Sequence, residues 1–140
     1  MALTSVHHVY GALMYNTPYR LHVLFFSIPV LLITVILGKM LDKLQARRFL
    51  YVFRIYAAII FIFSVLLIGL YEGVYNHIVK NLAFFSGMCK QALDTFFPPG
   101  IYVMPNDLIF EFTGVAQGVV GVWLAMQFVM LLKRWKFAKS

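Results

Sequence analysis

Three long apolar stretches restrict what this chain can fold into. They run from Leu21 to Leu37, from Phe49 to Tyr71 and from Leu108 to Leu132. About 20 mostly apolar residues cross the hydrocarbon core of a bilayer as an α-helix. We therefore predict an all-α integral membrane protein, a bundle of three transmembrane helices at about 18–38, 49–71 and 107–132. The whole of residues 1–140 forms one membrane domain in this interpretation.

The composition excludes most water-soluble classes of protein. Of the 140 residues, 62% are hydrophobic and only 12% are charged, which is too few polar residues to cover a soluble domain of this size. The single cysteine, Cys89, excludes a scaffold of intrachain disulfides. The formal net charge of +7 flanks the apolar stretches and does not form a groove-reading helix, so the expected partner is the lipid bilayer and not nucleic acid.

The distribution of basic residues predicts the orientation in the membrane. Nine of the 12 lysines and arginines lie in the 39–54 region or after Leu132. Basic residues in short loops favour the cytoplasmic side. The loop 39–48 and the tail 133–140 are therefore predicted to be cytoplasmic, and the N-terminus and the segment 72–106 to be non-cytoplasmic.

The segment between the second and third spans contains a further helical stretch. Residues 82–97 are apolar but are interrupted by Lys90 and Asp94, and they end at two prolines. This stretch is too short and too polar to span, which predicts a helix lying at the non-cytoplasmic interface. The run 96–102 that follows is apolar yet cannot be helical at its prolines. It either dips into the lipid headgroups or packs over the bundle as a lid.

Polar side chains collect at the outer ends of all three predicted spans. Ionisable groups in the hydrocarbon region cost roughly 2.5–3.5 kcal/mol at the bilayer centre and normally face the protein interior. In the third span, helical spacing places carboxylates on the same face as small residues. This face consists of Asp107, Glu111, Gly114, Gly118, Gly121 and Ala125. Small residues mark close helix contacts, so Glu111 is expected to face a neighbouring helix of this chain or of another copy.

Four of these residues are the candidate ligands of a metal site, namely Glu72, His77, Asp107 and Glu111. Histidine is the commonest metal ligand, and a carboxylate often holds its second ring nitrogen. The candidate cofactor is a transition-metal ion. Two simpler interpretations stay open: Asp107 caps the third helix, and His77 is an ordinary interfacial histidine.

The other potential ligands give a weaker signal. None of the usual metal-binding spacings, such as Cys-x-x-Cys or Glu-x-x-His, is present. His7 and His8 are adjacent, and neighbouring side chains on a helix diverge by about 100°. Together with Cys89 they are the next candidates if a metal is held elsewhere.

Three functions of different classes agree with these features. The first is a small polytopic membrane subunit whose non-cytoplasmic site binds a metal cation or a proton, within a homo-oligomer or a larger membrane complex. The second is a purely structural accessory subunit, in which the polar residues only pin helices together. The third is a redox or other enzyme subunit that holds a cofactor at this site, with His22 and His77 as conceivable haem ligands.

Overall fold

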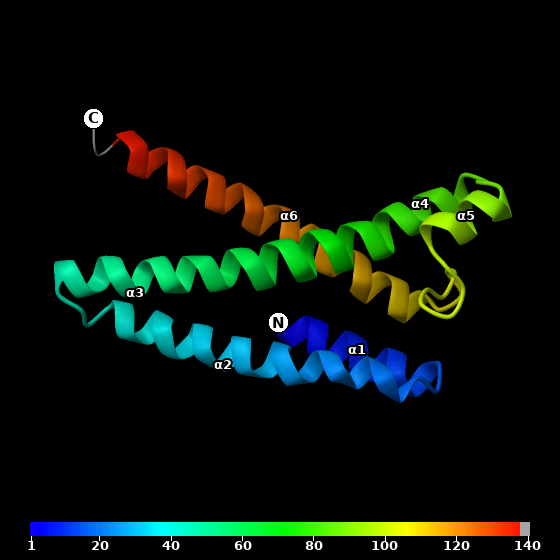
Figure 1. Ribbon diagram of the computed structural model, residues 1–140, viewed down its shortest axis with the longest axis horizontal. Helices are drawn as coiled ribbons and strands as arrows, with labels where there is room; N and C mark the ends of the chain where they lie inside the picture. Colours follow the sequence, from blue (N-terminus) through cyan, green and yellow to red (C-terminus); the bar gives the residue numbers. More distant parts are fainter. Residues whose placement is uncertain (138–140) are drawn as a thin grey trace.

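The computed structural model describes residues 1–137, and this part of the chain is helical with no β-strand (Figure 1). Residues 138–140 of the predicted basic tail lie outside the described part. The elements in chain order are α1 (Ala2–Met14), the 3₁₀-helix η1 (Pro18–Val23), α2 (Leu24–Leu41), α3 (Ala46–Ile59), the π-helix η2 (Ile60–Val79), α4 (Lys80–Phe85), α5 (Lys90–Phe96) and α6 (Leu108–Phe137).

Three helices are long and apolar enough to cross a membrane, as the sequence predicts. They are Pro18–Leu41, formed by η1 and α2, then Ala46–Phe85, formed by α3, η2 and α4, and Leu108–Lys133 in α6. The second helix is 40 residues long and does not end near Tyr71 as predicted. The helix therefore continues from Tyr71 to Phe85, and this extension carries the polar residues that follow Glu72.

The predicted helix over 82–97 is wrong in its bounds. Residues 82–85 complete the long second helix, and a separate helix, α5, begins at Lys90. Gly87 between them has a φ of 79°, a conformation that side chains disfavour and glycine permits. Leu93 and Phe97 then pack back against Ala83. The segment after α4 consequently folds over the end of the long helix.

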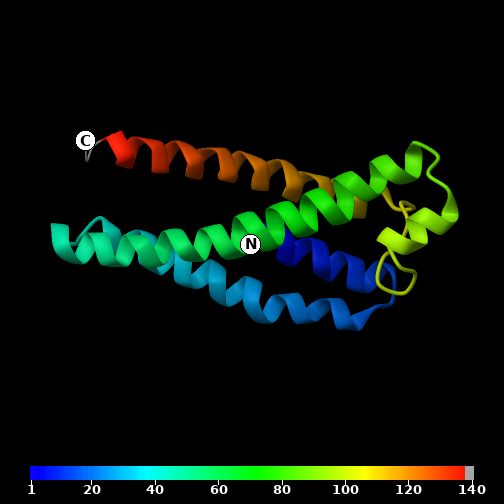
Figure 2. The ribbon, with the colours of Figure 1, turned by 45° about the horizontal axis from the view of Figure 1, so that its top comes forward.

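The N-terminal segment forms a helix, α1, that the sequence analysis did not predict. Figures 1 and 2 show α1 beside α2, with the N-terminus about halfway along the bundle. Its buried residues are Thr4, His7, His8, Gly11 and Ala12, which have the spacing of one helical face. This face packs against α2 and α6. Histidines near the start of the chain thereby enter the interior of the bundle.

The closest contact between long helices is a crossing of glycines in η2 and α6. A Cβ atom built on Gly73 would overlap with the backbone of Gly118, and one built on Gly69 would lie 2.5 Å from Cα of Gly121. Absence of side chains lets the two backbones touch. The predicted glycine face of α6 is therefore a helix interface, and its partner belongs to the same chain.

Replacing a glycine of this crossing with a larger residue tests whether the two helices are in backbone contact there. We expect Gly118→Leu to lower the free energy of unfolding by about 2 kcal/mol or more, because the added side chain forces two backbones apart. Val119, the next residue, is 59% exposed, so Val119→Leu is the matched control and should leave stability unchanged. Thermal unfolding in detergent measures both, and equal stability of the two variants would contradict the crossing.

Candidate metal centre

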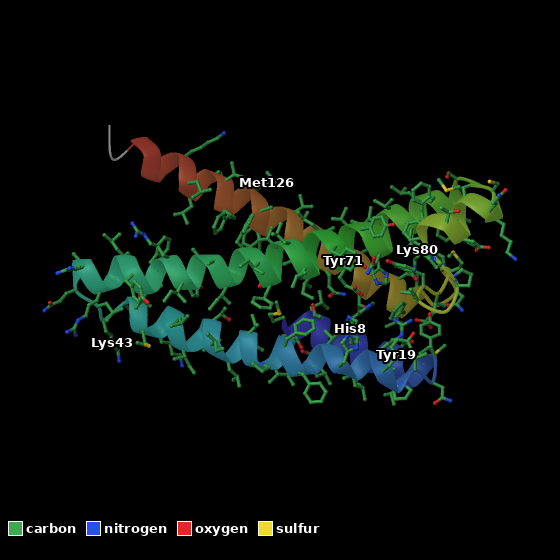
Figure 3. The ribbon with its side chains drawn as sticks, viewed as in Figure 1. His8, Tyr19, Lys43, Tyr71, Lys80 and Met126 are labelled. Atoms are coloured by element: carbon green, nitrogen blue, oxygen red, sulfur yellow. The ribbon has the colours of Figure 1, made fainter. Side chains whose placement is uncertain are left out.

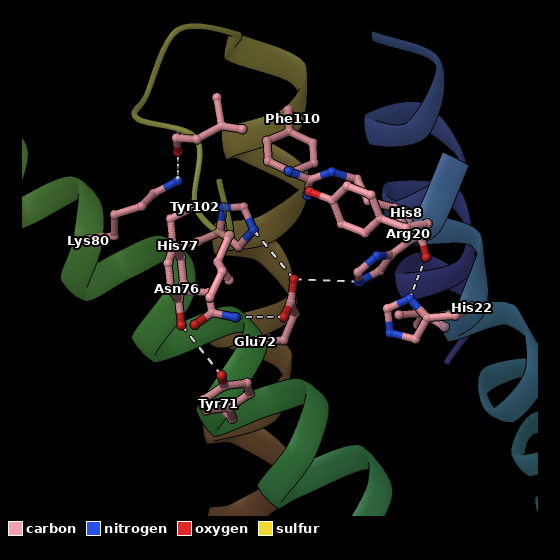
Figure 4. Close-up of a pocket in the computed structure, with 14 residues that line it drawn as sticks. His8, Arg20, His22, Tyr71, Glu72, Asn76, His77, Lys80, Tyr102 and Phe110 are labelled. Atoms are coloured by element: carbon pink, nitrogen blue, oxygen red, sulfur yellow. Dashed lines mark hydrogen bonds and ion pairs between the residues drawn. The ribbon is translucent and has the colours of Figure 1, made fainter. Parts of the chain in front are cut away.

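The carboxylate of Glu72, on η2, lies at the centre of three histidines. Its Oε1 atom is 3.5 Å from Nε2 of His8 and 3.9 Å from Nε2 of both His7 and His77. Its Oε2 atom accepts a hydrogen bond of 2.7 Å from Nδ2 of Asn76 (Figure 4). We call His7, His8, Glu72 and His77 the His–Glu cluster. Its nitrogen–oxygen distances exceed those of ordinary hydrogen bonds, which are about 2.7–3.2 Å.

The hydrogen-bond partner of His77 fixes which of its ring nitrogens carries the proton. Nδ1 lies 2.9 Å from Oε2 of Glu111, and an ionised carboxylate accepts but cannot donate. Nδ1 of His77 therefore donates to Glu111. In the neutral ring, Nε2 then presents a lone pair on the side of Glu72.

The same reasoning applies to His7, on α1. Its Nδ1 atom is 2.8 Å from the Thr113 hydroxyl, whose own proton is directed to the backbone oxygens of Ile109 and Phe110. A hydroxyl has one proton to donate, so Nδ1 of His7 is the donor in this pair. Its Nε2 atom is buried and has no hydrogen-bond partner among the described residues. Burial, reinforced by the nearby His77 and His8, lowers the pKa of His7 to about 3, so its ring is neutral at pH 7.

A buried ion pair between Lys80 and Glu111 contacts the cluster through His77. Nζ of Lys80 donates to Oε1 of Glu111 at 3.0 Å and to the backbone oxygen of Val103 at 2.7 Å. Both oxygens of Glu111 are therefore used, one by Lys80 and one by His77. The ring of His77 fills the space above Gly114, where any Cβ atom would overlap with it. The orientation of His77 is thus fixed by a carboxylate on one side and by a glycine on another.

A cavity of about 290 Å³ lies beside the cluster. His8, Glu72 and His77 contribute to its wall, together with Arg20 and with Tyr102 from the loop before α6 (Figure 4). This loop covers the end of the bundle, and Lys80 holds it through Val103. Three members of the cluster thus line one cavity together with a guanidinium and a tyrosine hydroxyl.

Three of the four predicted ligands lie together, and the fourth has a different role. Glu72, His77 and Glu111 meet at the contact of η2 with α6. Asp107 lies outside this arrangement. Its Oδ1 accepts a hydrogen bond of 2.7 Å from the backbone N–H of Phe110, and its Oδ2 accepts one from the Tyr10 hydroxyl. Asp107 therefore caps α6 and ties α1 to it.

His7 and His8, which the sequence analysis named only as the next candidates, are the other two histidines of the cluster. Their rings are 5.3 Å apart and nearly perpendicular, yet Nε2 atoms of both approach one oxygen of Glu72. Adjacent side chains can do this because the carboxylate lies between their two directions. The helical spacing of Thr4, His7, His8 and Gly11 was the available signal. The other candidates, His22 and Cys89, are both exposed.

Comparison with protein-family models, with curated proteins and with solved structures found no match. The chemistry of the centre is therefore inferred from its own geometry.

The pairing of Lys80 with Glu111 predicts a large effect on stability. We expect Lys80→Met to lower the free energy of unfolding by about 3 kcal/mol or more, because it leaves the buried carboxylate of Glu111 without its cation. Lys90 is an exposed lysine on α5, so Lys90→Met is the control and should change stability by less than about 0.5 kcal/mol. Denaturant or thermal unfolding compares the two, and similar losses would show that Lys80 is not a buried ionic partner.

Proposed function

We propose that this chain is a small helical membrane protein that binds a transition-metal ion in the His–Glu cluster, near the non-cytoplasmic ends of its three spans. One observation carries this proposal. Imidazole Nε2 atoms converge on one carboxylate oxygen, and the Nδ1 hydrogen bonds of His7 and His77 leave lone pairs on that side.

Electrostatics favours a cation at the point of convergence. Lone pairs of His7 and His77 that face the carboxylate of Glu72 repel it unless a positive charge lies between them. Zinc ligands at about 2.0–2.2 Å from a tetrahedral ion are about 3.3–3.5 Å from one another. Nε2 of His8 and Oε1 of Glu72 are 3.5 Å apart. One ring nitrogen of His7, one of His8 and one carboxylate oxygen of Glu72 all lie within 4.8 Å of one another. A small inward movement of the side chains would complete such a shell.

The donor set narrows the choice of metal. The imidazoles of His7 and His8 and the carboxylate of Glu72 lie within 4.8 Å of one another, and His77 approaches the carboxylate as a further imidazole donor. Such nitrogen and oxygen donors suit zinc, iron, copper(II) or nickel, whereas a soft copper(I) site would use thiolates or thioethers. The contact of the Glu111 carboxylate with His77 is of the kind that orients metal-bound histidines in other proteins, and the Thr113 hydroxyl fixes the ring of His7 in a similar way. Within the described residues, Glu72 also receives a hydrogen bond from Asn76, which fixes the direction of its carboxylate.

The outer surface of the bundle supports placement in a membrane. Large apolar side chains project outward, including Phe25 and Leu108, each 85% exposed, and Phe112 at 70%. Water-soluble monomers rarely expose such extensive apolar surface. Figure 3 shows Lys43 at one end of the bundle and Tyr19 and Lys80 at the other. With the basic 39–48 loop in the cytoplasm, the cluster belongs to the non-cytoplasmic half. Assembly with further membrane helices stays a prediction.

Metal titration of the purified chain tests the proposed function. We expect zinc to bind the parent protein with one ion per chain. We expect His7→Ala and His77→Ala to abolish tight binding, because each removes a ligand. Glu111→Gln should weaken binding about 10–100-fold, because it loosens the hold on His77. His22→Ala removes an exposed histidine at the same end and should bind like the parent.

Calorimetry and elemental analysis distinguish the alternatives. Negligible affinity of the parent for zinc, iron, copper and nickel would contradict the metal site and favour a purely structural accessory subunit. Undiminished binding by a His7→Ala/His77→Ala double variant would place the metal elsewhere in the chain.

Labelling of cysteines in intact cells tests the orientation. Native Cys89 is exposed in the turn between α4 and α5, at the end opposite to Ala46, where α3 begins (Figure 1). An impermeant maleimide should label Cys89 in the parent. It should not label Ala46→Cys in a Cys89→Ser background unless the membrane is permeabilised. The reverse pattern would overturn the orientation.

A further inference from the structure

We propose that the metal ion of the His–Glu cluster binds together with a small carboxylate anion, and that Arg20 holds this anion in the adjoining cavity. The inference rests on the proposed function and deepens it, because it assigns the chemical class of the second ligand. It is carried by the charge balance of the site and by the surroundings of Arg20.

The charges around the cluster balance before a metal enters. We count the carboxylates, lysines and arginines that line the cavity or contact the cluster. Glu72 and Glu111 contribute two negative charges, and Lys80 and Arg20 contribute two positive charges. A divalent ion therefore adds two positive charges that these groups do not offset. Uncompensated charge is costly in a poorly solvated interior. An anionic ligand on the metal removes part of this cost.

Arg20 is placed to receive such an anion. Its side chain is buried, at 8% exposure, and lines the same cavity as His8, Glu72 and His77. Its Nε atom donates to the Thr17 hydroxyl at 2.9 Å. Its two terminal nitrogens make no hydrogen bond within residues 1–133, whose side chains are described. These two nitrogens are not among the fully buried atoms that lack a partner, so their free donors are accessible from the cavity that Arg20 lines.

Aromatic rings keep the guanidinium in position. Its central carbon is 5.1 Å from the ring centre of Phe110, 5.5 Å from that of Tyr15 and 5.8 Å from that of Tyr19. Figure 4 shows Arg20 beside Phe110 on the wall of the cavity. These contacts restrict the movement of a side chain that would otherwise be flexible. The guanidinium group of Arg20 is therefore already oriented before a ligand binds.

The shape and lining of the cavity favour a carboxylate with a short apolar body. A guanidinium fork donates two parallel hydrogen bonds to a planar carboxylate. The cavity has a volume of about 290 Å³, and Val23 and Ile101 form apolar parts of its wall. The hydroxyl of Tyr102, 3.4 Å from that of Tyr71 in the same cavity wall, adds a neutral donor. One carboxylate oxygen can then face the metal while Arg20 binds the carboxylate.

Cobalt(II) is a suitable probe, because its visible absorption reports its ligands. The full-length protein in detergent is loaded with cobalt(II) and titrated with acetate and with butyrate. We expect a saturable spectral change with both anions. Arg20→Gln should weaken the affinity for the anions at least about tenfold, because it removes charge-assisted hydrogen bonds. It should not weaken cobalt binding, because it removes a positive charge near the metal. Lys90→Gln, on exposed α5, is the control.

The possible results distinguish a failure of the anion site from a failure of the metal site. A parent protein that does not bind cobalt contradicts the metal site itself. Cobalt binding without a spectral response to acetate or butyrate, or with an equal response in Arg20→Gln, overturns the anion site and leaves the metal site standing. Tighter binding of inorganic phosphate than of butyrate overturns the assignment to carboxylates. If Arg20→Gln does not fold, Arg20→Lys keeps the charge but loses the fork, and it should likewise weaken anion binding.

Discussion

The glycine crossing between η2 and α6 is the contact on which the rest of the structure depends. Gly69 and Gly73 meet Gly121 and Gly118 backbone to backbone, which lets two long helices pack closely. One turn nearer the start of α6, Gly114 leaves room for the ring of His77. The same stripe of small residues that joins the helices therefore also creates the place in which the His–Glu cluster forms.

The polar residues at this end form two connected layers. Lys80, Glu111 and His77 make a chain of short hydrogen bonds in which each group has its partner. Beyond it, the Nε2 atoms of the three histidines and Oε1 of Glu72 face one another at distances too long for hydrogen bonds. A well-paired inner layer thus holds an outer layer in which the Nε2 lone pairs of His7 and His77 face the carboxylate of Glu72. That contrast is the reason to interpret the outer layer as a binding site and the inner layer as its support.

The short helix α1 and the loop before α6 add side chains to the contact between the two long helices and complete the site. Helix α1 contributes His7 and His8 and is tied to α6 through Thr4 and Gln117, 2.6 Å apart. The loop is held by Lys80 through Val103. Neither element is long enough to span a bilayer. Their role in this fold is to close the space at one end of the three long helices while leaving the cavity next to Arg20.

The sequence by itself determined the three long apolar helices, the glycine face of α6 and the gathering of Glu72, His77 and Glu111 at one end, because length and helical periodicity are local properties. Only the tertiary structure decided that α1 inserts beside α2, that Lys80 pairs with Glu111 and that Asp107, one turn before Glu111, caps its helix. These features depend on the rotation and depth at which distant segments pack. His7 and Glu72 are far apart in the chain, and no local pattern specifies their meeting.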